Sequence, residues 1–290
     1  MFKPISFKYD HDLKKEIVLR GLSNNTFNNY RSQLRRIAEY FDKDLAEVSV
    51  EEAKQYLYHL RADLERNPQT INLCRAAFYF FNRCILGQEI SPYILPKHKV
   101  SLKLPTILPR DIILSVLEKL PLKYRAILSL CYGSGLRISE ALNIQIEDID
   151  SKEMRIFVRD GKGEKSRYSI LSGYSLITLR NYYKQHRPES SYLFPQYHNP
   201  DRPMNSQNIR KRFTDIYEHL YPKSNKRITI HTLRHCFATH MLDNGVDLRT
   251  IQTLLGHKSI KNTCIYLHLT SRHFSQLSSP LDQCRGDSLE

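Results

Sequence analysis

Residues His231–Tyr266 read HTLRHCFATHMLDNGVDLRTIQTLLGHKSIKNTCIY and carry the strongest pattern in the chain. The order of apolar and polar residues predicts two helices, over about 232–244 and 247–255. Gly256 directly follows the second helix and is typical of a helix stop, because glycine adopts the left-handed conformation that closes many helices. The stretch therefore predicts a helical region that ends a few residues before Tyr266.

Four side chains in this stretch have chemistry that suits a phosphate. His231 and Arg234 are three residues apart, so a helix places them on one face. His257 follows the glycine stop, and Tyr266 comes a short distance later. Imidazole and guanidinium groups can hold and protonate a phosphate, and a phenol can attack it.

A second arginine of this kind stands upstream, in the run Gly135-Leu-Arg-Ile-Ser-Glu140. The glycines are expected to end one helix before Arg137 opens the next. A guanidinium at that point can fork onto two phosphate oxygens while it stays charged. Glu140 is one helical turn away and can orient Arg137 by hydrogen bonding. Taken alone, Arg137 could equally be a surface arginine at a helix start.

A lysine completes the set. Met154–Val158 and Arg167–Leu171 are short β-type runs, and the glycines between them predict a hairpin turn. Lys162 stands at the tip of this hairpin, where its ammonium could donate a proton to a leaving alkoxide. Exposed lysines on turns are common, and Lys165 is a competing candidate.

Other interpretations of the histidines stay open at this stage. His231 and His235 have the i, i+4 spacing of a helical metal site, and Cys236 is adjacent. Position 232 is threonine, however, and not the glutamate of the His-Glu-x-x-His zinc motif. No metal site is predicted on this basis. His235 and His240 are interpreted as packing or surface residues.

Residues 1–90 are predicted to be entirely helical. The first clear helix covers Leu22–Phe41, with Ser23 or Asn25 as its cap. A second runs from about Val50 to Leu64. A third follows Asn67 and Pro68, a pairing that suits a helix start, and is expected to end before Gly87.

Residues 91–110 interrupt this pattern with four prolines and with Lys97, Lys99, Lys103 and Arg110. Proline lacks a backbone donor and restricts the preceding residue, so the segment is expected to be extended. We interpret it as a basic interdomain linker, with an ordinary surface loop as the alternative. Residues 111–290 would form a mixed domain, with helices at 111–119, 122–133, 173–184, 206–220, 232–244 and 247–255.

Composition restricts the class of protein and its partner. The 290 residues carry a net charge of +14, with a pI near 9.5, which favours a polyanionic partner. The six cysteines contain no Cys-x-x-Cys pair and are interpreted as reduced thiols rather than a disulfide frame. Neither a signal peptide nor a membrane span is visible, so a cytoplasmic location without membrane contact is predicted. Together, the phosphate-handling side chains and the basic charge predict an enzyme that cuts DNA through a phosphotyrosine bond.

On these residues the chain closely resembles the tyrosine recombinase (phage integrase) family, in length and layout most like its Xer-type and transposon- or integron-associated members. The likeness is densest over His231–His240, Asp247–His257 and Thr263–Tyr266, and Gly135–Glu140 and Gly161–Gly163 complete it. It implies a mainly helical fold with a small β-sheet: a helical DNA-gripping domain at 1–90, followed by an α+β catalytic domain at 111–290. Cys236 departs from the small hydroxyl residue that the family pattern leads one to expect.

The resemblance also implies a role for each of the six residues. Tyr266 would attack the scissile phosphorus to give a 3′-phosphotyrosyl enzyme, while Arg137 and Arg234 clamp the non-bridging oxygens. Lys162 would protonate the departing 5′ oxygen, and His257 would hydrogen-bond the phosphate. His231 would act as the general acid/base and could take the tyrosine proton. No metal ion, ATP or other cofactor is expected.

The partner implied is double-stranded DNA with a specific recombination site, on which four subunits assemble, possibly with a second recombinase. The C-terminal segment Ser271–Leu277 is expected to be exchanged between neighbouring subunits. Tentative DNA contacts are basic or polar residues on the N-terminal helices, the linker and the 206–220 helix: Arg31, Arg35, Asn72, Arg75, Lys97, Lys99, Lys103, Arg210, Lys211 and Arg212. Each of them could instead belong to a solvated surface.

The sequence thus predicts a site-specific DNA recombinase, such as one that moves a mobile element. Two alternatives stay open, the first with the same fold and the second with the same chemistry. One is a DNA-binding accessory protein that does not cut, and the filled set of six residues argues against it. The other is a type IB topoisomerase-like enzyme, which would relax any supercoiled plasmid without a defined site.

Overall fold

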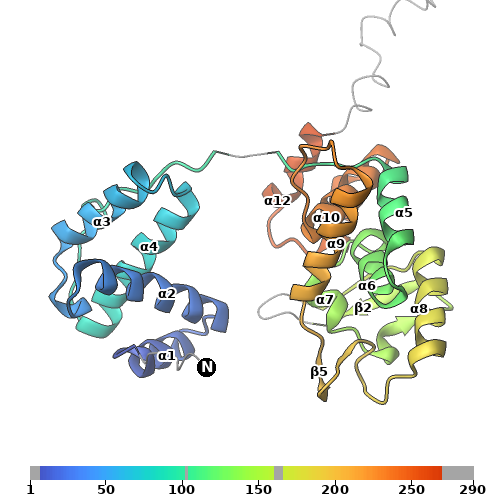
Figure 1. Cartoon of the computed structure of the whole chain (residues 1–290), viewed down its shortest axis with the longest axis horizontal. Helices are drawn as coiled ribbons and strands as arrows, with labels where there is room; N and C mark the ends of the chain where they lie inside the picture. Colours follow the sequence, from blue (N-terminus) through green and yellow to red (C-terminus); the bar gives the residue numbers. More distant parts are fainter. Residues whose placement is uncertain (1–6, 102–103, 160–165, 270–290) are drawn as a thin grey trace, which may run out of the picture. The chain divides into compact units, whose positions relative to one another are not determined.

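The computed structural model describes residues 7–101, 104–159 and 166–269, and Figure 1 shows its elements along the chain. The chain divides into two compact units between Lys103 and Leu104. Several candidate positions lie outside the described residues, namely Lys103, Lys162, Lys165 and the C-terminal segment Ser271–Leu277.

Every described element of regular secondary structure in the first unit is helical, as the sequence predicts. Its elements are α1 (Asp10–Leu19), α2 (Asn24–Phe41), the 3-10 turn η1 (Leu45–Glu47), α3 (Val50–Ala62), α4 (Pro68–Phe81) and the π-helical turn η2 (Asn82–Leu86). Helices α2 and α4 form the main contact of the unit, and α1 and α3 pack against that pair. The buried side chains between them include Leu13, Leu34, Ile37, Leu57, Ile71 and Phe78.

Side-chain caps set the helix starts in this unit. The Ser23 hydroxyl accepts a hydrogen bond from the Thr26 backbone, so Ser23 and not Asn25 caps α2. The Asn67 side chain caps α4 in the same way, with Pro68 in the first helical position. Gly87, at φ 68°, then ends the helical run where the sequence places the stop.

The segment after Gly87 has no helix or strand up to Pro109 within the described residues, but its first half is not a free linker. Leu95 is completely buried in the core of the first unit. The Asn72 side chain exchanges two hydrogen bonds with the backbone of His98, each 2.9 Å long. Residues 91–98 therefore pack onto α4 and belong to the first unit.

The second unit combines helices with two small antiparallel sheets. In chain order its elements are α5 (Arg110–Lys119), α6 (Leu122–Gly133), α7 (Ile138–Leu142), η3 (Ile146–Asp148), β1 (Ile149–Asp150), β2 (Arg155–Val158), β3 (Arg167–Ile170), α8 (Gly173–His186), β4 (Pro195–Gln196), β5 (Asn199–Pro203), α9 (Gln207–Leu220), α10 (Ile230–Asp243), α11 (Leu248–Leu255), α12 (Lys261–Cys264) and η4 (Ile265–His268). The fold class is the one predicted, mainly α with a small sheet.

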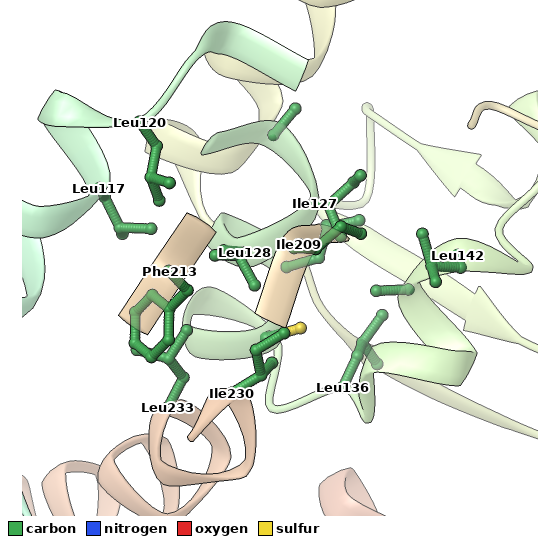
Figure 2. Packing of buried hydrophobic residues seen from close by; sticks show 14 of the residues in the cluster. Leu117, Leu120, Ile127, Leu128, Leu136, Leu142, Ile209, Phe213, Ile230 and Leu233 are labelled. Carbon is green, nitrogen blue, oxygen red and sulfur yellow. The ribbon is translucent and has the colours of Figure 1, made fainter. Parts of the chain in front are cut away.

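Helix α6 is the centre of this unit, with α5, α7, α8 and α10 all packed against it. Figure 2 shows Leu128 of α6 among side chains from α9 and α10, with Phe213 and Leu233 close by. Such a core fixes α7 and α10 relative to each other, because both contact α6. These two helices carry the candidate arginines.

The sheets differ in how well the sequence predicts them. Strands β1, β2 and β3 pair in that order, and Val158 of β2 lies opposite Arg167 of β3. This is the expected hairpin. The β4–β5 hairpin is not predicted, because the prolines in 195–203 are typical of a loop.

Helix α10 begins at Ile230, two residues earlier than predicted, so His231 already lies in its first turn. None of the described helices is long and apolar enough to cross a membrane.

Candidate active site

Arg234 is the most deeply buried charged side chain of the site, with 1% of its surface exposed. Its Nη1 donates to the carbonyl of Gly135 at 2.7 Å, and its Nη2 donates to the carbonyl of Leu255. Nε is buried and has no hydrogen-bond partner among the described residues. Two fixed carbonyls therefore hold the guanidinium in one orientation and leave the Nε donor uncommitted within the described residues.

Glu140 of α7 connects the charged groups of the site. Its carboxylate accepts from Arg137 Nη1 at 2.6 Å and from the Arg137 backbone at 2.8 Å. It also lies 3.5 Å from Nη1 of Arg234. The predicted orientation of Arg137 by Glu140 is thus present, and the same carboxylate reaches the second candidate arginine.

A third arginine, Arg167 of β3, is missing from the sequence prediction. Its Nη1 and Nη2 donate to the two carboxylate oxygens of Glu140 at 3.1 and 2.9 Å, and its Nε donates to the Leu254 carbonyl at 2.8 Å. The side chain is 9% exposed. Arg167, in the strand pair nearest the hairpin turn, therefore ties β3 to α7 and to the end of α11.

Three guanidinium groups around one carboxylate leave this part of the molecule strongly cationic. Burial alone would raise the pKa of Glu140, but the hydrogen bond and charge of Arg167, helped by Arg137 and Arg234, hold it below its ordinary value. Burial, followed by the charge of Arg137, lowers the pKa of Arg234 to about 10. Glu140 and Arg234 are therefore ionised at neutral pH, and three arginines around one carboxylate leave an excess of positive charge that suits a phosphodiester.

His257 is placed by the end of α11. Gly256 caps that helix in the left-handed conformation, at φ 65°, and the His257 backbone donates to the Gln252 carbonyl at 3.1 Å. Nδ1 of the ring lies 3.0 Å from the buried hydroxyl of Thr263. Burial, and then the charge of Arg234, lowers the pKa of His257 to about 4, so the ring is neutral at pH 7.

Tyr266 lies in η4, which packs against α10, and only 1% of its surface is exposed. The His257 ring is nearly parallel to the phenol ring, with 6.5 Å between ring centroids. Burial raises the pKa of Tyr266, while the charges of Arg234 and Arg137 oppose that rise. The ring is enclosed by apolar side chains of α10 and α11: Phe237, Ala238, Leu242, Ile251 and Leu255.

The Tyr266 hydroxyl contacts a residue that the sequence analysis interpreted as packing. Nδ1 of His235 lies 3.0 Å from this hydroxyl. The interpretation of His235 as a packing or surface residue is therefore incomplete. Burial, together with the neighbouring His231 and Arg234, lowers the pKa of His235 to about 4.

His231 is exposed and faces a different part of the site. A pocket of about 480 Å³ is lined by Arg137, His231 and Arg210 of α9, together with Ser139 and Thr214. Partial burial, and then the charges of Arg234 and Arg137, lowers the pKa of His231. The described candidates of the six thus come together from α7, α10, the end of α11 and η4, and Lys162 lies outside the described residues.

The tentative DNA contacts divide into two groups. Lys97, Lys99, Arg210, Lys211 and Arg212 are exposed. The other described candidates have partners within the first unit: Arg31 pairs with Asp10, Arg35 with Glu39, and Asn72 with the His98 backbone. Arg75 donates to the carbonyls of Leu95 and Pro92. Contact with DNA stays a prediction for all of them.

The spacing of His231 and His235 does not create a metal centre in the described residues. Their rings meet edge to face with 4.4 Å between centroids, and His235 is committed to the phenol. Cys236 instead accepts a hydrogen bond from the Leu108 backbone at 3.2 Å. No cluster of three or more His, Cys, Asp or Glu side chains that could hold an ion occurs in the described part of the chain.

Comparisons with known proteins identify the family of the chain. Residues 110–273 match the phage integrase family, and residues 11–92 match the phage integrase N-terminal SAM-like domain. A putative integrase/recombinase, y4qK, of Sinorhizobium fredii is 35% identical over 93% of this chain and 87% of its own length. The tyrosine recombinase XerA of Pyrococcus furiosus is 33% identical over 90% of this chain and 89% of its own.

Solved structures show the same fold. A crystal structure of XerA recombinase covers 97% of this chain and 100% of its own, with 26% identity and a TM-score of 0.52. XerH site-specific recombinase, bound to palindromic difH substrate in a post-cleavage complex, covers 94% of this chain and 85% of its own, with 22% identity and a TM-score of 0.68. The chain belongs to the phage integrase family and is a tyrosine recombinase.

Proposed function

We propose that this site-specific recombinase cuts and rejoins DNA with Tyr266 as the nucleophile. The phenolic oxygen attacks the scissile phosphorus, the bond to the 5′ oxygen breaks, and a 3′-phosphotyrosyl enzyme forms. The observation that carries the proposal is the burial of the Tyr266 phenol beside the guanidinium cluster. A buried phenol whose pKa burial raises and the charges of Arg234 and Arg137 lower is a functional-site candidate on physical grounds.

Arg137 and Arg234 are the proposed clamp on the non-bridging oxygens. The guanidinium of Arg234 is fixed by two carbonyls, and that of Arg137 by Glu140, through contacts within the protein itself. Donors that are already oriented lose little energy in reorganisation when charge develops on the phosphate. The buried Nε of Arg234, which has no protein partner among the described residues, is the donor best suited to a phosphate oxygen.

The remaining candidates handle protons and hydrogen bonds. His257 would donate to a phosphate oxygen, and Lys162 would protonate the departing 5′ oxygen. His231 lines the pocket that Arg137 and Arg210 share, which suits a role at the phosphate as general acid or base.

Metal and ATP are not required by this scheme. The arginines supply the positive charge that a metal ion would otherwise bring, and the phosphotyrosine ester retains roughly the energy of the bond it replaces. Strand cleavage is expected to survive EDTA. Loss of cleavage in EDTA that magnesium restores would contradict the scheme.

Double-stranded DNA with a specific site is the proposed partner, and the solved relative bound to its difH substrate supports it. The net charge of +14 and the exposed Arg210, Lys211 and Arg212 supply phosphate contacts, so affinity should fall steeply with salt. The reaction on such DNA would take place in the cytoplasm.

Exchange between two duplexes needs four active sites, so a tetramer on DNA is also proposed, formed by this chain alone or with a second recombinase. The segment Ser271–Leu277 is the proposed link between neighbours. Truncation after Thr270 should leave DNA binding intact and impair synapsis, measured by gel mobility of the two complexes. Normal recombination by the truncated chain would contradict this assignment.

The direct test of the proposed function uses suicide DNA sites, in which a nick lets the cut fragment diffuse away and traps the covalent complex. Wild-type protein should form an adduct on sites taken from the flanking genome, and Tyr266→Phe should bind the same sites without forming one. DNA binding without any adduct from the wild type would favour the accessory-protein alternative. Relaxation of plasmids that lack a site would favour topoisomerase-like activity.

A further inference from the structure

The Tyr266 hydroxyl and the His235 ring form a hydrogen bond between η4 and α10. The hydroxyl lies 3.0 Å from Nδ1 of His235, and the ring centroids are 5.7 Å apart. His231 is one turn earlier on α10, and its ring meets that of His235 edge to face, with 4.4 Å between centroids. The histidine that touches the nucleophile is therefore not the one in the first turn of the helix.

The direction of this hydrogen bond follows from the acidities of the partners. A phenol is a far stronger acid than the N–H group of a neutral imidazole, so the hydroxyl donates and Nδ1 accepts. Nε2 of His235 then carries the ring proton. The charged or titratable groups that face His235 within the described residues are Tyr266 from η4 and His231 and Arg234 from its own helix. Burial, followed by His231 and Arg234, keeps the imidazole neutral, with its lone pair on the phenolic proton.

We propose that His235 is a further catalytic residue, the base that receives the Tyr266 proton during strand cleavage. The inference rests on the proposed role of Tyr266. As the bond from the phenolic oxygen to phosphorus forms, the proton passes to Nδ1 of His235, and the bond from phosphorus to the 5′ oxygen breaks. The 5′ oxygen takes its proton from a separate acid, an ammonium group or water. In rejoining, the His235 imidazolium returns its proton to the phenol.

A weak base can serve in this position. The phenolic proton becomes strongly acidic as the oxygen bonds to phosphorus, so its transfer gains driving force during the attack. The incoming phosphodiester also brings negative charge, which favours the imidazolium. His231 is then left for the phosphate, since it is exposed and lines the pocket with Arg137.

The test compares single-turnover adduct formation by wild type and His235→Asn on a suicide site. The amide can hold a hydrogen bond but cannot accept a proton. Cleavage should slow by about 10²- to 10³-fold, while DNA affinity stays within about twofold. A His235→Asn protein that cleaves within about threefold of the wild-type rate overturns the inference.

Replacing the nucleophile separates a base from a structural support. 3-Fluorotyrosine at position 266, introduced by amber suppression, has a more acidic phenol and needs a base less. It should restore cleavage by His235→Asn at least about tenfold and change the wild-type rate much less. No restoration means that His235 only holds the ring, and the inference fails. If His235→Asn does not melt cooperatively, His235→Gln is measured in the same way.

The matched control lies on the same helix. His240 of α10 makes an equivalent pair, with Nδ1 2.9 Å from the hydroxyl of Tyr132. His240→Asn removes a histidine–tyrosine hydrogen bond of the same kind away from Tyr266, and its cleavage rate should respond to 3-fluorotyrosine as the wild type does. If the wild type forms no Tyr266 adduct, the proposed function fails. If the wild type does and His235→Asn matches it, only this inference fails.

Discussion

Gly256 and Arg167 approach so closely that no side chain fits between them. A Cβ built on Gly256 would lie 2.8 Å from Nη1 of Arg167 and 2.9 Å from its Cζ. The glycine also has φ 65°, a conformation that other residues rarely adopt. Gly256 therefore ends α11 and leaves room for Arg167, the arginine that binds Glu140. It also fixes where the chain carries His257, the next residue.

Gly256→Ala should consequently lower the free energy of unfolding by more than backbone strain alone would. The left-handed conformation alone costs about 1–2 kcal/mol for an alanine, and displacement of Arg167 adds to it. Gly245→Ala is the matched control, since φ is 85° there and nothing lies within 4 Å of the built Cβ. Denaturant unfolding should show a larger loss for Gly256→Ala, and adduct formation should fall about tenfold or more in that variant alone. Equal losses in both variants would mean that the Arg167 contact is unimportant.

Arg167 should act on catalysis through Glu140. Arg167→Gln removes the fork that holds both carboxylate oxygens, so Arg137 and Arg234 lose their fixed relation and cleavage should fall by about 10- to 100-fold. Arg167→Lys keeps the charge without the fork and should recover only part of the rate.

The control for this pair is Arg155→Gln. Arg155 lies on β2 of the same sheet, its side chain is 47% exposed, and it pairs with Asp150. An exposed pair of this kind contributes little, so its cleavage rate should stay near that of the wild type. An Arg167→Gln enzyme with unchanged single-turnover cleavage would remove Arg167 from the mechanism.

The contrast between Arg137 and Arg167 explains what the sequence could predict. Arg137 stands in a short motif with Glu140 three residues away, and helical geometry alone brings the two together. Arg167 is 27 residues from Glu140 in the sequence, beyond β1 and β2, so only the fold creates their contact. The sequence signal that could have found it is an arginine that directly follows a hairpin turn whose tip carries a candidate catalytic lysine.

Local patterns predicted elements well and tertiary partners poorly. The caps at Ser23 and Asn67 and the stop at Gly87 follow from rules that act over one helical turn, and the structure has them. His235 was interpreted as packing because its partner, the Tyr266 hydroxyl, comes from a separate helical turn. Arg75 resembles a DNA contact on an exposed helix face, yet it binds the backbone of residues 92–95.

Thr263 should determine which nitrogen of His257 carries the proton. The ring is neutral, and Nδ1 faces the Thr263 hydroxyl at 3.0 Å. If the hydroxyl donates to Nδ1, Nε2 keeps its hydrogen and can donate to a phosphate oxygen. Thr263→Val has nearly the same shape without a hydroxyl and should slow cleavage about tenfold, whereas Thr263→Ser should stay close to wild type. Indistinguishable single-turnover rates for the valine and serine variants would show that the hydroxyl has no such role.

Acid should destabilise the folded protein through the site histidines. The pKa values of His235 and His257 fall from 6.5 to about 4 on folding, and those of His231 and His240 move in the same direction. Between pH 4 and 6.5 the unfolded imidazoles bind protons that the folded ones do not, so the free energy of unfolding rises with pH in that window. This stability is present in full above pH 6.5 and is lost as the pH falls toward 4.

Each of the two strongly shifted rings should account for about 2 kcal/mol of this loss. The full pKa shift would correspond to more, but both rings are partly exposed and solvent screens some of the effect. Urea unfolding at pH 7 and pH 4.5 measures it. His235→Asn and His257→Asn should each flatten the dependence on pH, because an asparagine binds no proton in either state. His219→Asn is the control, since that ring is exposed on α9. A pH dependence as steep in the two site variants as in His219→Asn would show that neither ring resists protonation in the folded state.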